Sequence, residues 1–229
     1  MNKILLLLFS TTAFYSSGFS QTTERIYIKA GNDVWENFMK AIYLYPSFKE
    51  GMVEYKNGQR FLRPMNYNRI AGAVEFIDEK NDTLAIADEA AIGHINISGD
   101  VFVYSPVCLK FLSSRKVKLY SYEKMKIGDK QKIGAMGIPN TASAIESVEK
   151  IDTYQRSYNI DINETLILST TTSYYIQTGT SQITAATKKN VLTLFSKNGV
   201  EVKEYIKSNN ISFNKHGDLM KLVSFLDQL

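Results

Sequence analysis

From about residue 49 the apolar positions change pattern every eight to twelve residues, which is the spacing of short strands and turns in a β-rich domain. Residues 52–55 and 60–65 flank Asn57-Gly58, a dipeptide suited to a type I′ hairpin turn. Because short turns join only antiparallel neighbours, we expect an antiparallel meander of roughly eight to ten short strands. Further hairpins are predicted from residues 73–77 with 83–87, 92–97 with 101–104, and 107–112 with 116–122.

The second half of this region is less regular. Residues 165–169 and 173–178 are rich in β-branched and aromatic residues, so we expect them to add a last hairpin to the sheet. Residues 128–137 are punctuated by glycines. Residues 142–154 place apolar side chains three apart among charged ones, a pattern that fits a short helix or a loop equally.

After Gln182 the apolar spacing changes from two towards 3.6 residues and predicts three short helices. Gly199 separates the first two, Asn209 and Asn210 separate the second from the third, and Asn214 is the expected N-cap of the last. Such short helices are not stable alone, so their apolar stripes should pack on the sheet or on each other. The apolar clusters lie at residues 191–195, 202–206 and 219–226.

The region before the meander has two interpretations. Residues 25–29 alternate as a strand, whereas Val34, Phe38 and Ile42 lie at helical spacing. Residues 41–45 could equally form an edge strand that Pro46 ends. Trp35 is expected to pack in the core, with sugar stacking as the alternative.

The first twenty residues have the layout of a secretory signal peptide. Lys3 gives a positive start, residues 4–9 an apolar run, and Gly18 and Ser20 small residues before Gln21. We therefore expect a secreted protein of the periplasm or cell exterior that starts near Gln21. The rest of the chain has no apolar run of the roughly 18 to 20 residues that span a membrane, and no cysteine near residue 21 to carry a lipid anchor.

Together these patterns predict an α+β fold with three parts. After the signal peptide at residues 1–20, a β-rich body is expected at 21–182 and a helical tail packed on it at 183–229. The body should form an antiparallel β-meander, as a curved sheet or partial barrel, and the tail a small C-terminal helical segment.

The charge balance argues against a nucleic-acid partner. Of 27 basic residues, Lys3 lies in the leader, which leaves 26 against 23 acidic residues. The densest basic stretch, around Lys116 and Lys118, alternates with Val117 and Leu119 as a half-buried strand would, whereas a nucleic-acid binder gathers its basic residues in a patch. A hydrophobic content of 44% is ample for one packed core.

The residues that could carry chemistry are few. Cys108 is the only cysteine, so no internal disulfide can form, and its strand context favours a small buried hydrophobe over a nucleophilic thiol. His94 and His216 are the only histidines and stand in no zinc motif. No G-x-S-x-G elbow is present, although a hydrolase with either histidine as base stays possible.

Two further motifs are better explained as turns. Gly128, Gly134 and Gly137 could form a nest for phosphate, but the phosphate-loop motif is absent. The acids at residues 78–82 lack the calcium-loop spacing, so a solvated hairpin tip explains them better. The sequence thus predicts no catalytic residue, cofactor or metal ligand.

Seven segments, spread over most of the chain after residue 20, are distinctive together. They are YLYPSFKEGMVEYKNG at 43–58, MNYN at 65–68, VEFID at 74–78, NDTLAIA at 81–87, ATKKNVLTLF at 186–195, EVKEYIKSNNISFNK at 201–215 and DLMKLVSFL at 218–226. They resemble a family of exported proteins of Bacteroidetes-type bacteria for which no activity is known. The resemblance implies an envelope or extracellular location and supplies no catalytic residues. Its most distinctive piece is MNYN, where Asn66 and Asn68 are expected to serve a turn or bulge, with ligand contact as the alternative.

Two functional hypotheses follow. The first is a non-enzymatic envelope protein, a binding or structural component that holds a protein partner, or a hydrophobic or glycan ligand, on its curved sheet. The alternative is a hydrolase acting on envelope polymers, with His94 or His216 as base. The position of the two histidines relative to a cleft distinguishes them.

Overall fold

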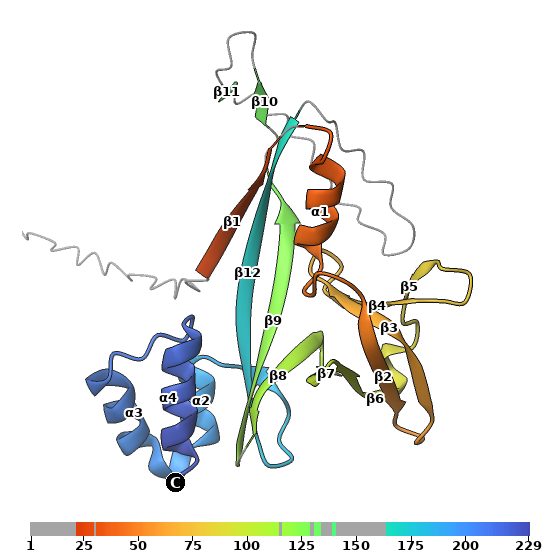
Figure 1. The fold of residues 1–229 in the computed structure, drawn as a ribbon. Coiled ribbons are helices and arrows are strands. Elements are labelled where there is room, and N and C mark those ends of the chain that lie inside the picture. Colours follow the sequence, from red (N-terminus) through yellow and green to blue (C-terminus); the bar gives the residue numbers. More distant parts are fainter. Residues whose placement is uncertain (1–21, 30, 115, 129–130, 134–138, 141–163) are drawn as a thin grey trace, which may run out of the picture.

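The residues that the structure describes form a thirteen-stranded antiparallel sheet with four α-helices (Figure 1). The computed structural model describes residues 22–29, 31–114, 116–128, 131–133, 139–140 and 164–229. The sheet is open and not closed into a barrel. Its strands are β1 (Thr22–Ile28), β2 (Lys49–Tyr55), β3 (Arg60–Asn68), β4 (Ala73–Ile77), β5 (Thr83–Ala85), β6 (Ile92–Ile97), β7 (Asp100–Tyr104), β8 (Cys108–Ser114), β9 (Val117–Ile127), β10 (Gln131–Ile133), β11 (Pro139–Asn140), β12 (Glu164–Thr178) and β13 (Thr184–Ala185).

The expected single meander is in fact two. One runs β2-β3-β4-β5 and the other β6-β7-β8-β9, and the pairing of β2 with β6 joins them. After β5 the chain forms the short 3₁₀ helix η1 (Glu89–Ala91) and returns beside β2. There the backbone N–H of Lys56 donates to the carbonyl of Ala91 at 2.8 Å. This return places β6 against β2 and leaves β5 at the end of the strand order.

The last expected hairpin is one continuous strand, β12, which is fifteen residues long. Its middle, residues 170–172, is Thr-Thr-Thr, which has high β propensity and none of the residues that favour a turn. Thr171 pairs with Thr23 of β1 on one side and with Lys124 of β9 on the other. Neighbours on both edges therefore hold the strand extended where the sequence pattern suggested a break.

The hairpin at Asn57-Gly58 forms as expected, but its turn type differs. Gly58 has a φ of +85°, whereas Asn57 is not among the positive-φ residues. The Gly58 N–H donates to the Tyr55 carbonyl at 2.9 Å, which fits a type I turn closed by a glycine bulge. The two-residue turn with both φ angles positive lies instead at Ser98 and Gly99, between β6 and β7.

The N-terminal ambiguity is resolved in favour of a helix. Helix α1 (Val34–Ile42) buries Val34, Phe38 and Ile42, the three residues at helical spacing. The helix lies against β1, and its apolar face joins a core cluster from β1, β9 and β12. Residues 41–45 do not form the alternative edge strand, although Tyr43 makes an isolated bridge to Asn68.

The three C-terminal helices are confirmed as α2 (Lys188–Leu194), α3 (Gly199–Ser208) and α4 (His216–Leu226), with the 3₁₀ helix η2 (Ser196–Asn198) between the first two. The expected cap at Asn214 is wrong by one position, because Lys215 occupies the N-cap of α4 and makes no side-chain capping bond. The Asp218 carboxylate instead accepts from the Ser212 N–H at 3.2 Å.

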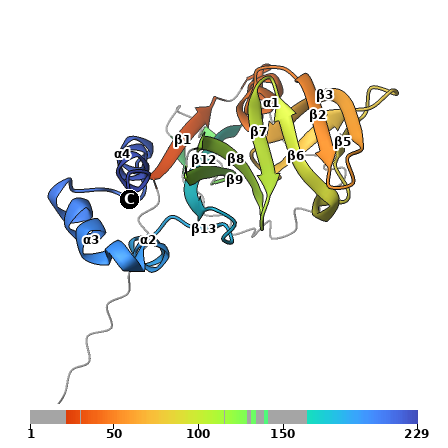
Figure 2. The ribbon, with the colours of Figure 1, turned by 90° about the horizontal axis from the view of Figure 1, so that it is seen from below.

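The helices pack on the β9–β12 ribbon, on the side away from the curled strands β2–β7 (Figures 1 and 2). Val117, Leu119 and Ile176 of the ribbon are each at most 1% exposed and share one core cluster with the helices. The Val117 N–H also donates to the Asp227 carboxylate at 2.8 Å. A second core cluster fills the interior of the curled half, around Val53, Ile95 and Phe102.

Four sequence predictions lie outside the described residues. These are the signal peptide at 1–20, the start of the mature chain at Gln21, the undecided segment 142–154, and Gly134 with Gly137 of the glycine-rich stretch.

Candidate ligand-binding pocket

The sheet curls so that strands far apart in its hydrogen-bonding order face each other. The Tyr104 hydroxyl on β7 accepts from the Val74 N–H on β4 at 3.4 Å. The Met125 N–H on β9 donates to the Arg69 carbonyl at 2.8 Å, and the Tyr67 hydroxyl donates to the Glu123 carbonyl at 2.8 Å. These contacts hold β3 and β4 against β7 and β9 across the curl.

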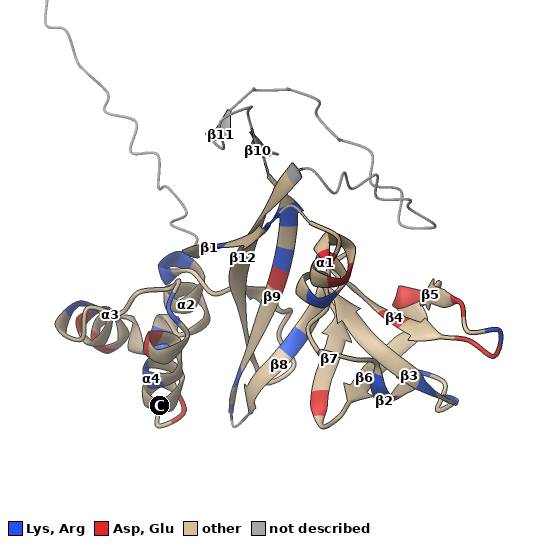
Figure 3. Cartoon of the chain, turned by 45° about the horizontal axis from the view of Figure 1, so that its top comes forward, with Lys and Arg blue, Asp and Glu red and all other residues tan. Residues whose placement is uncertain are grey.

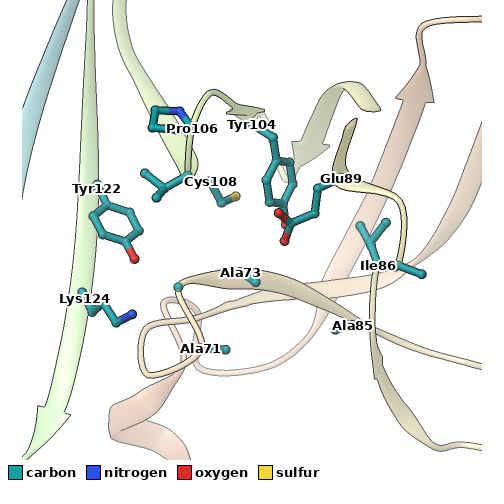
Figure 4. A pocket seen from close by; sticks show the side chains of 13 residues that line it. Ala71, Ala73, Ala85, Ile86, Glu89, Tyr104, Pro106, Cys108, Tyr122 and Lys124 are labelled. Carbon is teal, nitrogen blue, oxygen red and sulfur yellow. The ribbon is translucent and has the colours of Figure 1, made fainter. Parts of the chain in front are cut away.

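A cavity of about 280 Å³ lies where these strands meet. Four segments line it: residues 71–73, 85–89, 104–108 and 122–124. Figure 4 shows side chains from all four directed around one hollow. Glu89 and Lys124 are exposed, so the cavity reaches the surface. A cavity of this size, just below the usual range for drug-sized ligands, suits one small molecule.

Small residues create this space. Four alanines and a glycine, at positions 71, 72, 73, 85 and 87, line the cavity on the β4 and β5 side. Gly72 has a φ of +71°, and a Cβ there would lie 2.6 Å from the Tyr122 hydroxyl oxygen. Tyr122 can therefore lie over bare backbone, and longer side chains at the alanine positions would occupy the cavity.

The cavity has phenols and two opposite charges on its walls. Tyr122 and Lys124 lie on one side, from β9, while Tyr104 and Glu89 lie on the other (Figure 4). Neither Glu89 nor Lys124 forms a salt bridge with any other residue that the structure describes. Burial raises the pKa of the Glu89 carboxyl. Burial is the main cause that raises the pKa of Tyr104, Tyr122 and Cys108, and the negative charge of Glu89 adds to it.

Cys108 is the buried hydrophobe that its strand context predicts. It is 2% exposed and belongs to the core cluster of the curled half. Burial raises the pKa of its thiol to about 12, against the opposing effect of a hydrogen bond with Tyr104. Because the thiolate is the reactive form, the protonated sulfur at neutral pH is a weak nucleophile.

The two histidines lie apart from the cavity and from each other. His94 is half-buried in β6, beside Glu54 of β2 in the strand register. His216 is the exposed first residue of α4, with its ring 6.3 Å from the ring of Tyr174. Neither lines the cavity. Within the described ranges, no three His, Cys, Asp or Glu side chains gather where a metal ion could bind.

The acidic segment at 78–82 is a hairpin tip. The Asp78 carboxylate accepts from the N–H groups of Lys80 and Asp82 at 2.9 and 2.8 Å, and Glu79 pairs with Arg63 at 2.7 Å. Of the glycine-rich stretch, Gly128 is described. Its N–H donates to the Ile167 carbonyl at 2.6 Å, which ties the end of β9 to β12.

Asn66 and Asn68 of the MNYN segment have structural roles. The Asn68 side-chain oxygen accepts from the N–H groups of Ile70 and Ala71 at 2.9 and 3.0 Å, which holds the turn before β4. Asn66 exchanges two hydrogen bonds with the backbone of Tyr45, at 3.1 and 2.9 Å. Both side chains are buried. Trp35 was expected in the core, but it is 46% exposed on α1.

The basic stretch around Lys116 and Lys118 is a half-buried strand, as expected. Val117 and Leu119 are buried in the core, whereas Lys116 is exposed and Lys118 half-buried. Figure 3 shows charges of both signs along β9. No helix in the described part of the chain has the length and apolar character needed to cross a membrane.

Comparisons with protein-family models, with curated proteins and with solved structures each found no match to this chain. The resemblance to an exported family therefore stays a prediction.

The sequence analysis did not identify the cavity. Its lining residues come from four segments that only the curl of the sheet brings together. The one local signal was the run of small residues around Gly72, in Ala-Gly-Ala at 71–73.

Proposed function

We propose that this chain is an exported envelope protein that binds a small ligand without transforming it, in the cavity between β4, β5, β7 and β9. The cavity is the observation that carries the proposal: four segments of the curled sheet enclose about 280 Å³ with mixed apolar and polar walls. Such a concave site with a few convergent polar groups is the usual form of a small-molecule site. Export is supported by the signal-peptide pattern of residues 1–20.

The titration behaviour of the two phenols and the thiol in the lining favours binding over catalysis by these groups. Burial raises the pKa values of Tyr104, Tyr122 and Cys108, all of which already titrate above neutrality. A general acid or base works best with a pKa near the working pH. These three groups therefore stay protonated and serve as fixed hydrogen-bonding and packing surfaces.

The hydrolase alternative would need a histidine in a cleft beside a serine or carboxylate. Neither His94 nor His216 lines the cavity, so the described geometry adds no support to that alternative.

The test is to fill the cavity. Ala85→Leu places a larger side chain in the lining, and Ala90→Leu is the matched control on an exposed alanine outside it. A diverse fragment library is screened by ligand-observed NMR against the wild-type protein and both variants. We expect compounds that bind the wild type and the Ala90→Leu variant but not the Ala85→Leu variant. The proposal fails if no compound binds, or if the filled variant binds every compound as the wild type does.

A further inference from the structure

From the charges at the cavity we infer that its ligand is a small zwitterion with an apolar body, of the size of a single amino acid. Lys124 would pair with the carboxylate of this ligand and Glu89 with its ammonium group. The inference rests on the proposed binding function and specifies its ligand class.

The first step of the argument is the placement of the charges. Lys124 and Glu89 lie on opposite sides of the cavity (Figure 4). Neither is satisfied by a salt bridge with another described residue, although opposite charges elsewhere on this protein do pair, as Lys110 does with Asp100 at 2.7 Å. A ligand that carries both charges would satisfy the two groups at once. A ligand of one sign would satisfy one group and be repelled by the other.

The second step is the position of Glu89 at the rim, where it is exposed to solvent but loses part of its hydration to the cavity wall. This partial desolvation raises the pKa of its carboxyl. A bound ammonium group would offset that desolvation by a charge-assisted hydrogen bond. A ligand carboxylate beside Glu89 would be disfavoured, because like charges repel at close range.

The third step is the apolar part of the cavity lining. Ile86, Val107 and Pro106 contribute apolar surface, and the small residues of the β4 and β5 side leave room beside them. Tyr104 and Tyr122 add aromatic surface and a hydroxyl each. An aliphatic side chain of a ligand would bury its surface here while its charged groups point to the rim, where Glu89 and Lys124 reach solvent.

The experiment compares four probes that differ in charge. L-leucine is the zwitterion; 4-methylpentanoate lacks its ammonium group, 3-methylbutylamine lacks its carboxylate, and N-acetylglucosamine is a neutral sugar. Dissociation constants are measured by NMR titration of the full chain. We expect L-leucine to bind at least about tenfold more tightly than each of the others, the scale of one charge-assisted hydrogen bond.

Two isosteric or near-isosteric variants assign each charge. Lys124→Met should weaken the binding of L-leucine and 4-methylpentanoate by about tenfold and should not weaken that of 3-methylbutylamine, which loses a repulsion. Glu89→Gln should weaken the binding of L-leucine and 3-methylbutylamine and should not weaken that of 4-methylpentanoate. The controls are Lys126→Met, on the same strand but outside the lining, and Glu201→Gln on α3. Both should bind all probes as the wild type does.

The outcomes separate this inference from the proposed function. If Ala85→Leu abolishes the binding of library compounds but L-leucine binds no more tightly than its two analogues, the cavity is a ligand site and the inference of a zwitterionic ligand is wrong. The inference would also be overturned if the sugar binds most tightly, or if Lys124→Met and Glu89→Gln leave the dissociation constants unchanged. If nothing binds in the cavity, both proposals fall.

Discussion

The hydroxyl oxygen of Tyr122 lies 2.6 Å from the point where a Cβ atom on Gly72 would be. Gly72 stands in the turn that leads into β4, and Tyr122 comes from β9, which is not a hydrogen-bonded neighbour of β4. Their contact is therefore tertiary and closes one side of the cavity. A glycine is required here twice, for its positive φ and for the space that the phenol occupies.

Gly72→Ala should consequently destabilise the protein more than Gly58→Ala. Both glycines have positive φ, but a Cβ on Gly58 meets nothing within 4 Å. We expect a loss of about 1 to 2 kcal/mol in unfolding free energy for Gly58→Ala, from backbone strain alone, and about 2 to 4 kcal/mol for Gly72→Ala, with overpacking added. Urea denaturation measures both, and equal losses would contradict the contact. Adding Tyr122→Phe to Gly72→Ala should bring its loss of unfolding free energy closer to that of Gly58→Ala.

Ser98 is the non-glycine residue of the two-residue turn between β6 and β7, with a φ of +52°. Asparagine adopts this conformation more readily than serine, and valine does so poorly. We expect Ser98→Asn to raise the midpoint of thermal unfolding and Ser98→Val to lower it by the equivalent of about 1 to 2 kcal/mol. A stabilising valine would show that the turn is not held in the left-handed region.

The helical tail should depend on its core contacts with the β9–β12 ribbon. Leu222 of α4 is 0% exposed in that cluster, whereas Val200 of α3 is 76% exposed. Leu222→Ala should cost about 2 to 5 kcal/mol in unfolding free energy, while Val200→Ala should change it by less than about 0.5 kcal/mol.

A peptide of residues 184–229 tests the same dependence directly. Without the ribbon its short helices lose their packing surface, so circular dichroism should show little helix in water. A monomeric, fully helical peptide would contradict this.

Asp100 should make stability depend on pH. Burial favours its neutral form, but hydrogen bonds from Lys110 at 2.7 Å and Tyr45 at 2.6 Å prevail and hold the pKa of the carboxyl below its ordinary value of 3.8. The folded-state pKa is thus below the unfolded one. Its stabilising contribution is present above the unfolded pKa and is lost as the pH falls through the folded pKa.

The measurement is the free-energy difference between the wild type and Asp100→Asn as a function of pH. We expect Asp100→Asn to be destabilising near about pH 6 and the difference to shrink below about pH 4. Lys110→Met should remove most of this pH dependence, since Lys110 supplies the charge. A difference that stays constant with pH would show that the carboxylate is not selectively stabilised.

The signal-peptide pattern predicts the start of the mature protein. Because residues 1–20 have the charged, apolar and small-residue regions of a signal peptide, we expect the protein isolated from the periplasm or medium to begin at or very near Gln21. N-terminal sequencing reads this directly. Substituting Leu6 with arginine should keep the chain in the cytoplasm, and secretion unaffected by that change would exclude the signal-peptide interpretation.

Local patterns predicted those elements whose surroundings match their own sequence. Residues 73–77 and 92–97 are short, largely apolar segments beside polar turns and form β4 and β6 with those bounds. The helical spacing of Val34, Phe38 and Ile42 marks the buried face of α1. The sequence pattern gave a wrong prediction where pairing with neighbouring strands determines the structure. β12 stays continuous because β1 and β9 pair along its middle, and β1 lies far away in the sequence.

The cavity lies beyond local prediction for the same reason. Neither Glu89 nor Lys124 stands in a sequence motif. Glu89 is an acidic residue in a turn, and Lys124 is a lysine in a strand. The return of the chain through η1 places β6 beside β2, and the contacts of β3 and β4 with β7 and β9 across the curl bring the lining segments together. The residues of that return show no hydrophobic periodicity from which it could have been predicted.

The pairing of β1 with β12 has a consequence for the rate of folding. Thr22 lies opposite Thr172 and Ile28 opposite Leu166, so one of the first strands to be synthesised waits for one of the last. Closing so long a loop slows folding, because its entropy is lost before the contacts form. Among the described residues β12 is the only partner strand of β1, so β1 stays unpaired until residues 166–172 are in place beside it.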